Sequence, residues 1–256
     1  MNNKPAYLVV GQGRWGSRMH TMLEHEGRRA NFATNTRRTI GESDLAYESR
    51  MAGSFKASGA HIAWLCVPPG PHVPPMVRAA ISAGLHVLVE KPWIYSQGET
   101  SALLHAAHGA KRVTGVHFEY CLLSHVENWR TEHHERNDLS FGGTFNVGAG
   151  DHLGISATQN LGSHLLAIHE YAVPHSKISS IQCAYQAPNQ RRVWLEAARE
   201  RIAEIDFLGS PEPIIQRFVA GFENSLEGIP FPLDFSFALR VKEKLAALQT
   251  GSQTNS

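Results

Sequence analysis

The chain has 256 residues, of which 42% are hydrophobic and 18% are charged, as in an ordinary globular protein rather than a disordered or fibrous one. Its formal net charge is +1, which gives no electrostatic reason to expect a nucleic-acid partner or an anionic membrane. No apolar run reaches the roughly 18 residues of a membrane span, so no membrane partner is expected either.

The cysteines and histidines do not follow the patterns that disulfides or metals require. Cys66, Cys121 and Cys183 are odd in number, far apart and without metal-ligand spacing. The 15 histidines include no HExxH pair. We therefore predict no metal. Because no charged and then apolar leader opens the sequence, we expect a reduced, cytoplasmic compartment.

The first 120 residues alternate short apolar runs with helical stretches. The runs that read as strands are 7–10, 30–34, 62–67, 86–89 and 113–116. Between them lie helical segments, the first over 14–26, with apolar residues three and four positions apart. This alternation is typical of a doubly wound parallel sheet with right-handed crossovers. We predict a dinucleotide-binding domain over residues 1–120.

The rhythm changes after residue 120, which predicts a smaller second domain of the α+β type over residues 121–248. The expected helices cover 122–130, 161–171, 213–226 and 235–248. The expected strands cover 178–186, 192–197 and 202–208, the last two forming a hairpin. The polar tail over 249–256 has no apolar anchor and is predicted to be disordered.

A glycine motif follows the first predicted strand directly. It reads Gly11-Gln12-Gly13-Arg14-Trp15-Gly16 and opens the first predicted helix. In this context the first glycine permits a tight turn, the second lets the backbone approach a pyrophosphate, and the third allows close packing of helix and strand. We predict that this loop binds the phosphates of a dinucleotide at the helix N-terminus.

The end of the second strand indicates which dinucleotide is bound. An NAD site usually carries an acidic residue there. This chain instead has Asn35-Thr36-Arg37-Arg38. Arginine would form charge-assisted bonds with a 2′-phosphate, although paired arginines on a loop are also ordinary surface residues. We therefore expect NADP in preference to NAD.

Two further stretches follow strand ends, where open α/β sheets bind their ligands. The first, Cys66-Val67-Pro68-Pro69-Gly70-Pro71-His72, is either a rigid connector or a part of the cofactor site. The second is Glu90-Lys91-Pro92, which taken alone would be a surface turn.

Residues 64–72 and 79–92 together closely resemble the glucose–fructose oxidoreductase / inositol dehydrogenase / rhizopine catabolism (Gfo/Idh/MocA) family. The resemblance is specific over residues 6–116 and looser to about residue 248. It implies a Rossmann domain followed by an open-sheet α/β domain, shorter here than is usual in the family. It also implies NAD or NADP as cofactor, and a sugar, cyclitol or related small molecule as substrate.

The resemblance also implies roles for individual residues. Lys91 would stand beside nicotinamide and substrate and help to move the proton of the reacting oxygen, while Glu90 orients the loop and Pro92 sets its path. In the second domain the family places an Asp and a His four residues apart. Here these positions are Asn160 and His164, which leaves proton transfer to Lys91 and His164 and the positioning of substrate to Asn160.

Glu119 stands where many members of the family have a basic residue. It suits a cationic or polyhydroxy substrate, or a structural salt bridge. His169, five positions after His164, is expected to be a packed or surface residue.

These observations predict an NADP-dependent oxidoreductase that transfers a hydride between nicotinamide and an alcohol or ketone carbon of a sugar-like or small biosynthetic substrate. Two alternatives stay open: a reductase of C=N bonds with the same fold, and a non-catalytic NADP-binding sensor or partner protein. We expect a small-molecule substrate as the partner, and a homodimer is a possible assembly.

Overall fold

The computed structural model describes residues 4–148, 156–187, 190–197 and 212–251. The chain divides into two compact units. Unit 1 comprises Met1–His117 together with Gly221–Ser236, and unit 2 comprises Phe118–Ala220 together with Phe237–Ser256.

Unit 1 is built on a parallel sheet of five strands, in the order β2-β1-β3-β4-β5. The strands are β1 (Tyr7–Val10), β2 (Ala30–Phe32), β3 (Ile62–Leu65), β4 (His86–Val89) and β5 (Thr114–Val116). All four residues of β1 and of β3 are buried, because helices cover both faces of the sheet. The five strands predicted from the apolar runs are confirmed, with β2 and β3 each two residues shorter than expected.

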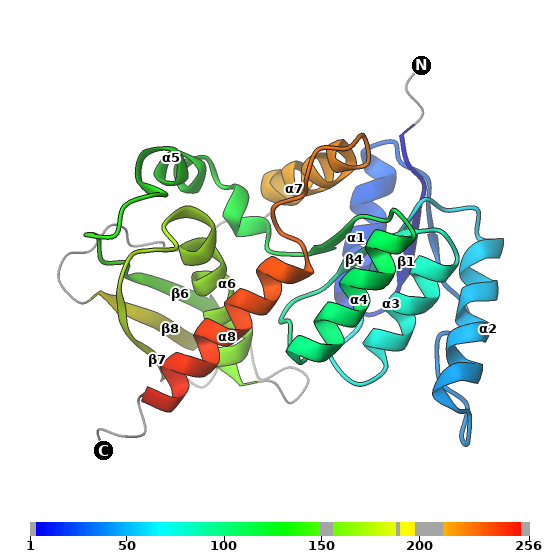
Figure 1. The fold of residues 1–256 in the computed structure, drawn as a ribbon, viewed down its shortest axis with the longest axis horizontal. Coiled ribbons are helices and arrows are strands. Elements are labelled where there is room, and N and C mark those ends of the chain that lie inside the picture. The colour runs from blue at the N-terminus through cyan, green and yellow to red at the C-terminus, as the bar shows by residue number, and fades with distance from the viewer. Residues whose placement is uncertain (1–3, 149–155, 188–189, 198–211, 252–256) are drawn as a thin grey trace. The chain divides into compact units, whose positions relative to one another are not determined.

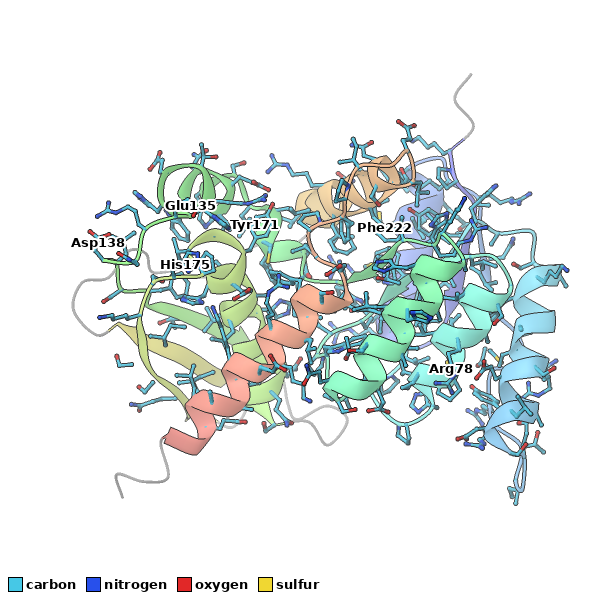
Figure 2. The ribbon with its side chains drawn as sticks, viewed as in Figure 1. Arg78, Glu135, Asp138, Tyr171, His175 and Phe222 are labelled. Carbon is cyan, nitrogen blue, oxygen red and sulfur yellow. The ribbon has the colours of Figure 1, made fainter. Side chains whose placement is uncertain are left out.

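Helices connect these strands in doubly wound fashion (Figure 1). They are α1 (Arg14–His25), α2 (Asp44–Ala57), α3 (Val73–Ser82) and α4 (Gln97–Gly109). Helix α3 packs against both α2 and α4, and Arg78 of α3, labelled in Figure 2, forms an ion pair of 2.7 Å with Glu48 of α2. Ser43 caps the start of α2 and Ser96 that of α4, the latter in a capping box with Glu99.

Gly221–Ser236 belongs to unit 1, which differs from the boundary predicted near residue 120. The Glu223 carboxylate accepts hydrogen bonds from Tyr7 at 2.8 Å and from Arg28 at 2.7 and 2.8 Å. The backbone N–H of Val116 donates to the Leu233 carbonyl at 2.8 Å, which extends the pairing of β5. These contacts join residues between 117 and 216 positions apart, so no local sequence pattern could have indicated them.

Unit 2 combines helices with an antiparallel sheet in the order β6-β8-β7. Its elements are a 3-10 helix (Glu119–Leu122), α5 (Ser124–His133), β6 (Gly143–Gly148), α6 (Ala157–Ala172), β7 (Ile178–Ala187), β8 (Gln190–Ala197) and most of α7 (Glu212–Ser225) and α8 (Phe235–Gly251). Tyr171 of α6 (Figure 2) donates a hydrogen bond to Glu127 of α5 at 2.7 Å and accepts one from Arg130 at 2.8 Å. The α/β fold of unit 1 and the α+β character of the second part are thus as predicted.

Several element predictions in unit 2 need correction. Strand β6 lies in a glycine-rich stretch where no strand was predicted. Strand β8 pairs with β7 and with β6. The predicted strand over 202–208, and with it the predicted hairpin, lies outside the described residues. Helix α6 begins at Ala157, four residues earlier than expected, because the Ser156 side chain caps it. Helix α8 continues to Gly251 into the predicted tail, whose residues 252–256 are not described.

Among the described helices, none combines the length and the apolar character that crossing a membrane would require.

Candidate functional site

The glycine loop lies directly against the end of β3. Gly11 has a φ of +112°, and a Cβ atom placed on it would approach the Cys66 carbonyl oxygen to 2.5 Å. A Cβ on Gly16 would collide with the Gly11 carbonyl oxygen. Both positions therefore require glycine, the first for its backbone conformation and the second for close packing, as the motif predicts.

Gly13 behaves differently, because a Cβ on it would meet no described atom within 4 Å. It is exposed and forms the N-cap of α1, where no side chain accepts a hydrogen bond from the first turn. The starts of α2 and α4 are, by contrast, each closed by a serine side chain. The first turn of α1 thus has no side-chain cap, and amides at such a helix N-terminus can bind an anion.

Cys66 and Val67, both predicted to bind cofactor, pack against the glycine loop. The Cys66 Cβ lies 3.3 Å from a Cβ built on Gly16, and a Val67 methyl group lies 3.1 Å from one built on Gly11. The Cys66 side chain is buried, and this burial raises the pKa of its thiol well above the usual value. A role for either residue in cofactor contact stays a prediction.

The loop after β2 presents the two predicted arginines in different states. Asn35 adopts the left-handed conformation with a φ of 54°, which asparagine tolerates better than most residues. The Arg38 guanidinium pairs with the Asp44 carboxylate and donates to the Glu42 carbonyl at 2.9 Å. Arg37 is exposed, and within the described part of the chain its side chain forms no ion pair. Arg14, at the start of α1, is exposed as well.

The proline-rich loop after β3 is closed by its own contacts. The Tyr95 hydroxyl lies 3.3 Å from both the N–H and the carbonyl oxygen of Gly70. The His72 ring folds back over Gly70, and burial lowers the pKa of His72 although a hydrogen bond with the Pro68 backbone opposes this. This geometry is that of a rigid connector. Cofactor contact by Pro68 and His72 stays a prediction.

The carboxylate of Glu90 is held inside unit 1. Its Oε1 atom accepts a hydrogen bond of 3.0 Å from the indole N–H of Trp64 and lies 3.0 Å from Nδ1 of His117. The His117 ring is fully buried and contacts the Trp64 ring at 5.1 Å and the Trp15 ring at 5.8 Å. Glu90 is thus anchored to His117, whose ring contacts Trp15 of the glycine loop, and it fixes the backbone at the half-buried Lys91.

Pro92, the third residue of this motif, is buried and follows a cis peptide bond.

Sequence reasoning missed Trp64, Tyr95 and His117 as supports of this site. A signal for His117 was present, since it directly follows β5 as Glu90 follows β4. The two strands are paired with Val89 opposite Val116, so the next residue of each lies beside the other. Predicting that contact required the strand order as well as the strands.

In unit 2, the predicted residues Asn160 and His164 lie one turn apart on α6. His164 is 4% exposed, and its ring contacts the Tyr120 ring at 4.8 Å and the Phe118 ring at 6.3 Å. Asn160 is half-buried, and its carbonyl accepts a hydrogen bond from Ser163 at 3.1 Å. Glu119 is buried in the 3-10 helix that also carries Tyr120.

His169 is a packed residue, as predicted. Its Nε2 atom lies 3.0 Å from the Ser176 carbonyl oxygen and its Nδ1 atom lies 3.2 Å from the Lys244 ammonium group. Burial lowers the pKa of His169 to about 4, and the charge of Lys244 acts in the same direction.

The predicted site residues therefore form two sets, one in each unit: the glycine loop, the arginine loop and Lys91 in unit 1, and Glu119, Asn160 and His164 in unit 2. Among the described residues no group of three or more His, Cys, Asp or Glu side chains is arranged to hold a metal ion.

Comparisons with known proteins agree with this geometry. Residues 6–118 match the GFO_IDH_MocA family model, described as an oxidoreductase family with an NAD-binding Rossmann fold. No curated protein sequence matches the chain.

Similar solved structures cover both units. UDP-N-acetylglucosamine 3-dehydrogenase GnnA from Acidithiobacillus ferrooxidans has a TM-score of 0.66 and 13% identity, over 96% of this chain and 97% of that one. GenD2 from gentamicin A biosynthesis, in complex with NAD, has a TM-score of 0.66 and 14% identity, over 100% of this chain and 96% of that one. Apo scyllo-inositol dehydrogenase from Lactobacillus casei has a TM-score of 0.66 and 13% identity, over 100% of this chain and 98% of that one. At identities this low, the structural similarity establishes a shared fold alone.

Proposed function

Because this chain belongs, through residues 6–118, to the Gfo/Idh/MocA family of oxidoreductases with an NAD-binding Rossmann fold, we propose that it is an NADP-dependent oxidoreductase. Its substrate would be a secondary alcohol, or the matching ketone, of a sugar or cyclitol. The observation that carries the proposal is the open N-terminus of α1, where Gly13 leaves room for a pyrophosphate.

The choice of NADP rests on the loop after β2. Residues 33–38, which directly follow β2, include no acidic residue to bind a ribose 2′-hydroxyl, and the exposed Arg37 offers a charge-assisted bond to a 2′-phosphate. The family description and the GenD2 complex name NAD. Direct titration decides between the two, and NADPH should bind more tightly than NADH.

The substrate class follows from the names of similar structures together with the polar groups of unit 2. GnnA and the scyllo-inositol dehydrogenase act, by their names, on a sugar nucleotide and on a cyclitol. Asn160 offers an amide and His164 an imidazole, both of which can bind hydroxyl groups. A polyhydroxylated small molecule suits these donors and acceptors.

The bound nicotinamide supplies the hydride chemistry. In the direction of oxidation, the hydroxyl proton passes to Lys91, and His164 shares in this transfer. In the direction of reduction, the same groups return a proton to the carbonyl oxygen. Asn160 replaces a carboxylate and positions the substrate without accepting a proton. Glu90, Trp64 and His117 hold the backbone of Lys91 in place.

The test is a screen of sugar nucleotides, cyclitols, small ketones and imines for consumption or formation of NADPH. Once a substrate is found, Lys91→Met should lower kcat about 100-fold or more, because a positioned acid or base contributes about 10²–10⁴, while NADPH affinity stays within about twofold of the wild type. Lys56→Met is the matched control, since Lys56 is an exposed lysine in the last turn of α2.

Unchanged turnover in Lys91→Met would refute the role of Lys91. Turnover of imines alone would indicate a C=N reductase. NADPH binding without turnover of any compound in the screen would favour a sensor.

A further inference from the structure

The loop between β2 and α2 is organised by two side chains of α2. The Tyr47 hydroxyl donates to the Thr36 carbonyl at 2.8 Å. The Arg50 guanidinium donates to the carbonyl oxygens of Asn35 and Arg37, the latter at 3.0 Å. Three successive carbonyl groups are therefore bound to one helix. This fixes the backbone on which Arg37 and Arg38 are carried.

Arg50 is in turn held by Glu42. Its Nε atom donates to Oε1 at 2.8 Å and its Nη2 atom to Oε2 at 2.9 Å, a bidentate pair. Oε2 also accepts the Thr39 N–H at 3.0 Å. Hydrogen bonds from Arg50 and then from Thr39 lower the pKa of Glu42 to about 2, so the carboxylate is charged at neutral pH.

This network separates the two neighbouring arginines. Arg38 is occupied by the Asp44 carboxylate and the Glu42 carbonyl, and its guanidinium lies 5.8 Å from the Tyr47 ring centroid. The backbone of Arg37 is held, because Arg50 binds its own carbonyl and Tyr47 binds that of Thr36, while its side chain is exposed. The fork of Arg50 is itself filled by Glu42 and two carbonyls. Arg37 is thus the arginine of this loop that can bind an anionic ligand.

We infer that Arg50, clamped by Glu42, is the positioning residue that holds Arg37 for recognition of the 2′-phosphate of NADP, and that it thereby determines the preference for NADP over NAD. This inference rests on the proposed function. Arg50 acts through the loop and not by touching the cofactor. Its contribution should appear in the ratio of NADPH to NADH affinity, whereas a general loss of structure would weaken both cofactors.

The experiment titrates NADPH and NADH into the full-length protein and its variants by fluorescence or calorimetry. Arg37→Ala should weaken NADPH about 10- to 100-fold and NADH by less than about twofold, because it removes a charge-assisted bond to phosphate. Arg50→Gln should weaken NADPH about three- to tenfold, again with little effect on NADH. Arg50→Lys, which keeps the charge but not the bidentate fork, serves if Arg50→Gln does not fold.

The matched control is Arg29→Gln. Arg29 also donates to a backbone carbonyl, that of Gly59 at 2.8 Å, but at the amino ends of β2 and β3, whereas the Arg37 loop follows the carboxyl end of β2. Its loss changes the net charge by the same amount as Arg50→Gln. NADPH affinity should change by less than about twofold.

Glu42→Gln separates positioning from simple charge attraction. If Arg50 acted only through its positive charge, removal of the nearby negative charge of Glu42 would strengthen NADPH binding. Loss of the clamp should instead weaken NADPH about two- to fivefold.

The outcomes distinguish two failures. If Arg37→Ala affects NADPH and NADH equally, the assignment of NADP fails, and the inference fails with it. If Arg37→Ala is selective for NADPH but Arg50→Gln lowers both affinities equally, or Glu42→Gln tightens NADPH, only the role of Arg50 is refuted.

Discussion

Glu90 shows how a motif residue can serve a site without facing a ligand. Its carboxylate points to Trp64 and His117, both fully buried, and the next residue along the chain is the half-buried Lys91. The roles of Gly11 and Gly16 could be predicted from sequence because they depend on local geometry. The partners of Glu90 could not, because they come from other strands.

The hydrogen bond from Trp64 to the Glu90 carboxylate should be stronger than an equivalent bond to a hydroxyl. Trp93 offers the comparison, since its indole N–H donates at 3.0 Å to the Thr100 hydroxyl and it too is buried. Trp64→Phe should lower the free energy of unfolding by about 1 kcal/mol more than Trp93→Phe, because bonds to charged groups are worth more. Urea titration measures both, and an equal or larger loss for Trp93→Phe would argue against the Glu90 anchor.

At the scale of elements, sequence predicted best where a periodic pattern coincided with burial. Strands β1 and β3 are apolar runs buried on both faces, and α7 begins and ends within one residue of its prediction. Strand β6 was missed because its alternation is short, with only Phe145 and Val147 apolar, and has glycine at both ends, which disfavours a strand. The pairing of β8 with β6 and β7 depends on tertiary contacts between distant segments.

Helix α8 is tied to α6 by a group of charged and buried residues. Glu170 accepts hydrogen bonds of 2.6 Å from both Arg240 and Lys244, and Lys244 also lies against His169 and donates to the Pro174 carbonyl. Burial acts to raise the pKa of Glu170, but the hydrogen bonds from Lys244 and Arg240 outweigh it and lower the pKa. The carboxylate therefore stays charged through the pH range in which histidine titrates.

This arrangement predicts a loss of stability in mild acid. An unfolded imidazole takes up a proton near pH 6.5, whereas folded His169 does so only near pH 4. Between these values the unfolded state binds more protons, so stability that is present above pH 6.5 is lost as the pH falls toward 4. The loss from this group is about 2–3 kcal/mol. His169→Leu should flatten the decline measured by urea unfolding.

The exposed His175, labelled in Figure 2, provides the control. His175→Leu should leave the pH dependence as in the wild type. An unchanged acid decline in His169→Leu would show that other groups cause it.

On the scale of the whole molecule, the chain passes between the two units more than once. Gly221–Ser236 returns to unit 1, where Glu223 neutralises the buried Arg28 and Phe222 packs near Gly115 and Phe231. A linear reading placed this segment in the second domain because its helical pattern looks the same in either place. The predicted shortening of the second domain relative to the family stays a prediction.

The Gly13→Asp variant shows whether unit 1 binds the pyrophosphate of NADP at the start of α1. Gly13 has a φ of −69° and a ψ of 177°, a conformation that suits an N-cap aspartate, and a Cβ there meets no described atom within 4 Å. Thermal stability should be unchanged or slightly higher. A carboxylate in the phosphate site should nevertheless weaken NADPH binding by about two orders of magnitude. If a folded Gly13→Asp protein bound NADPH as tightly as the wild type, the pyrophosphate would not bind at the start of α1.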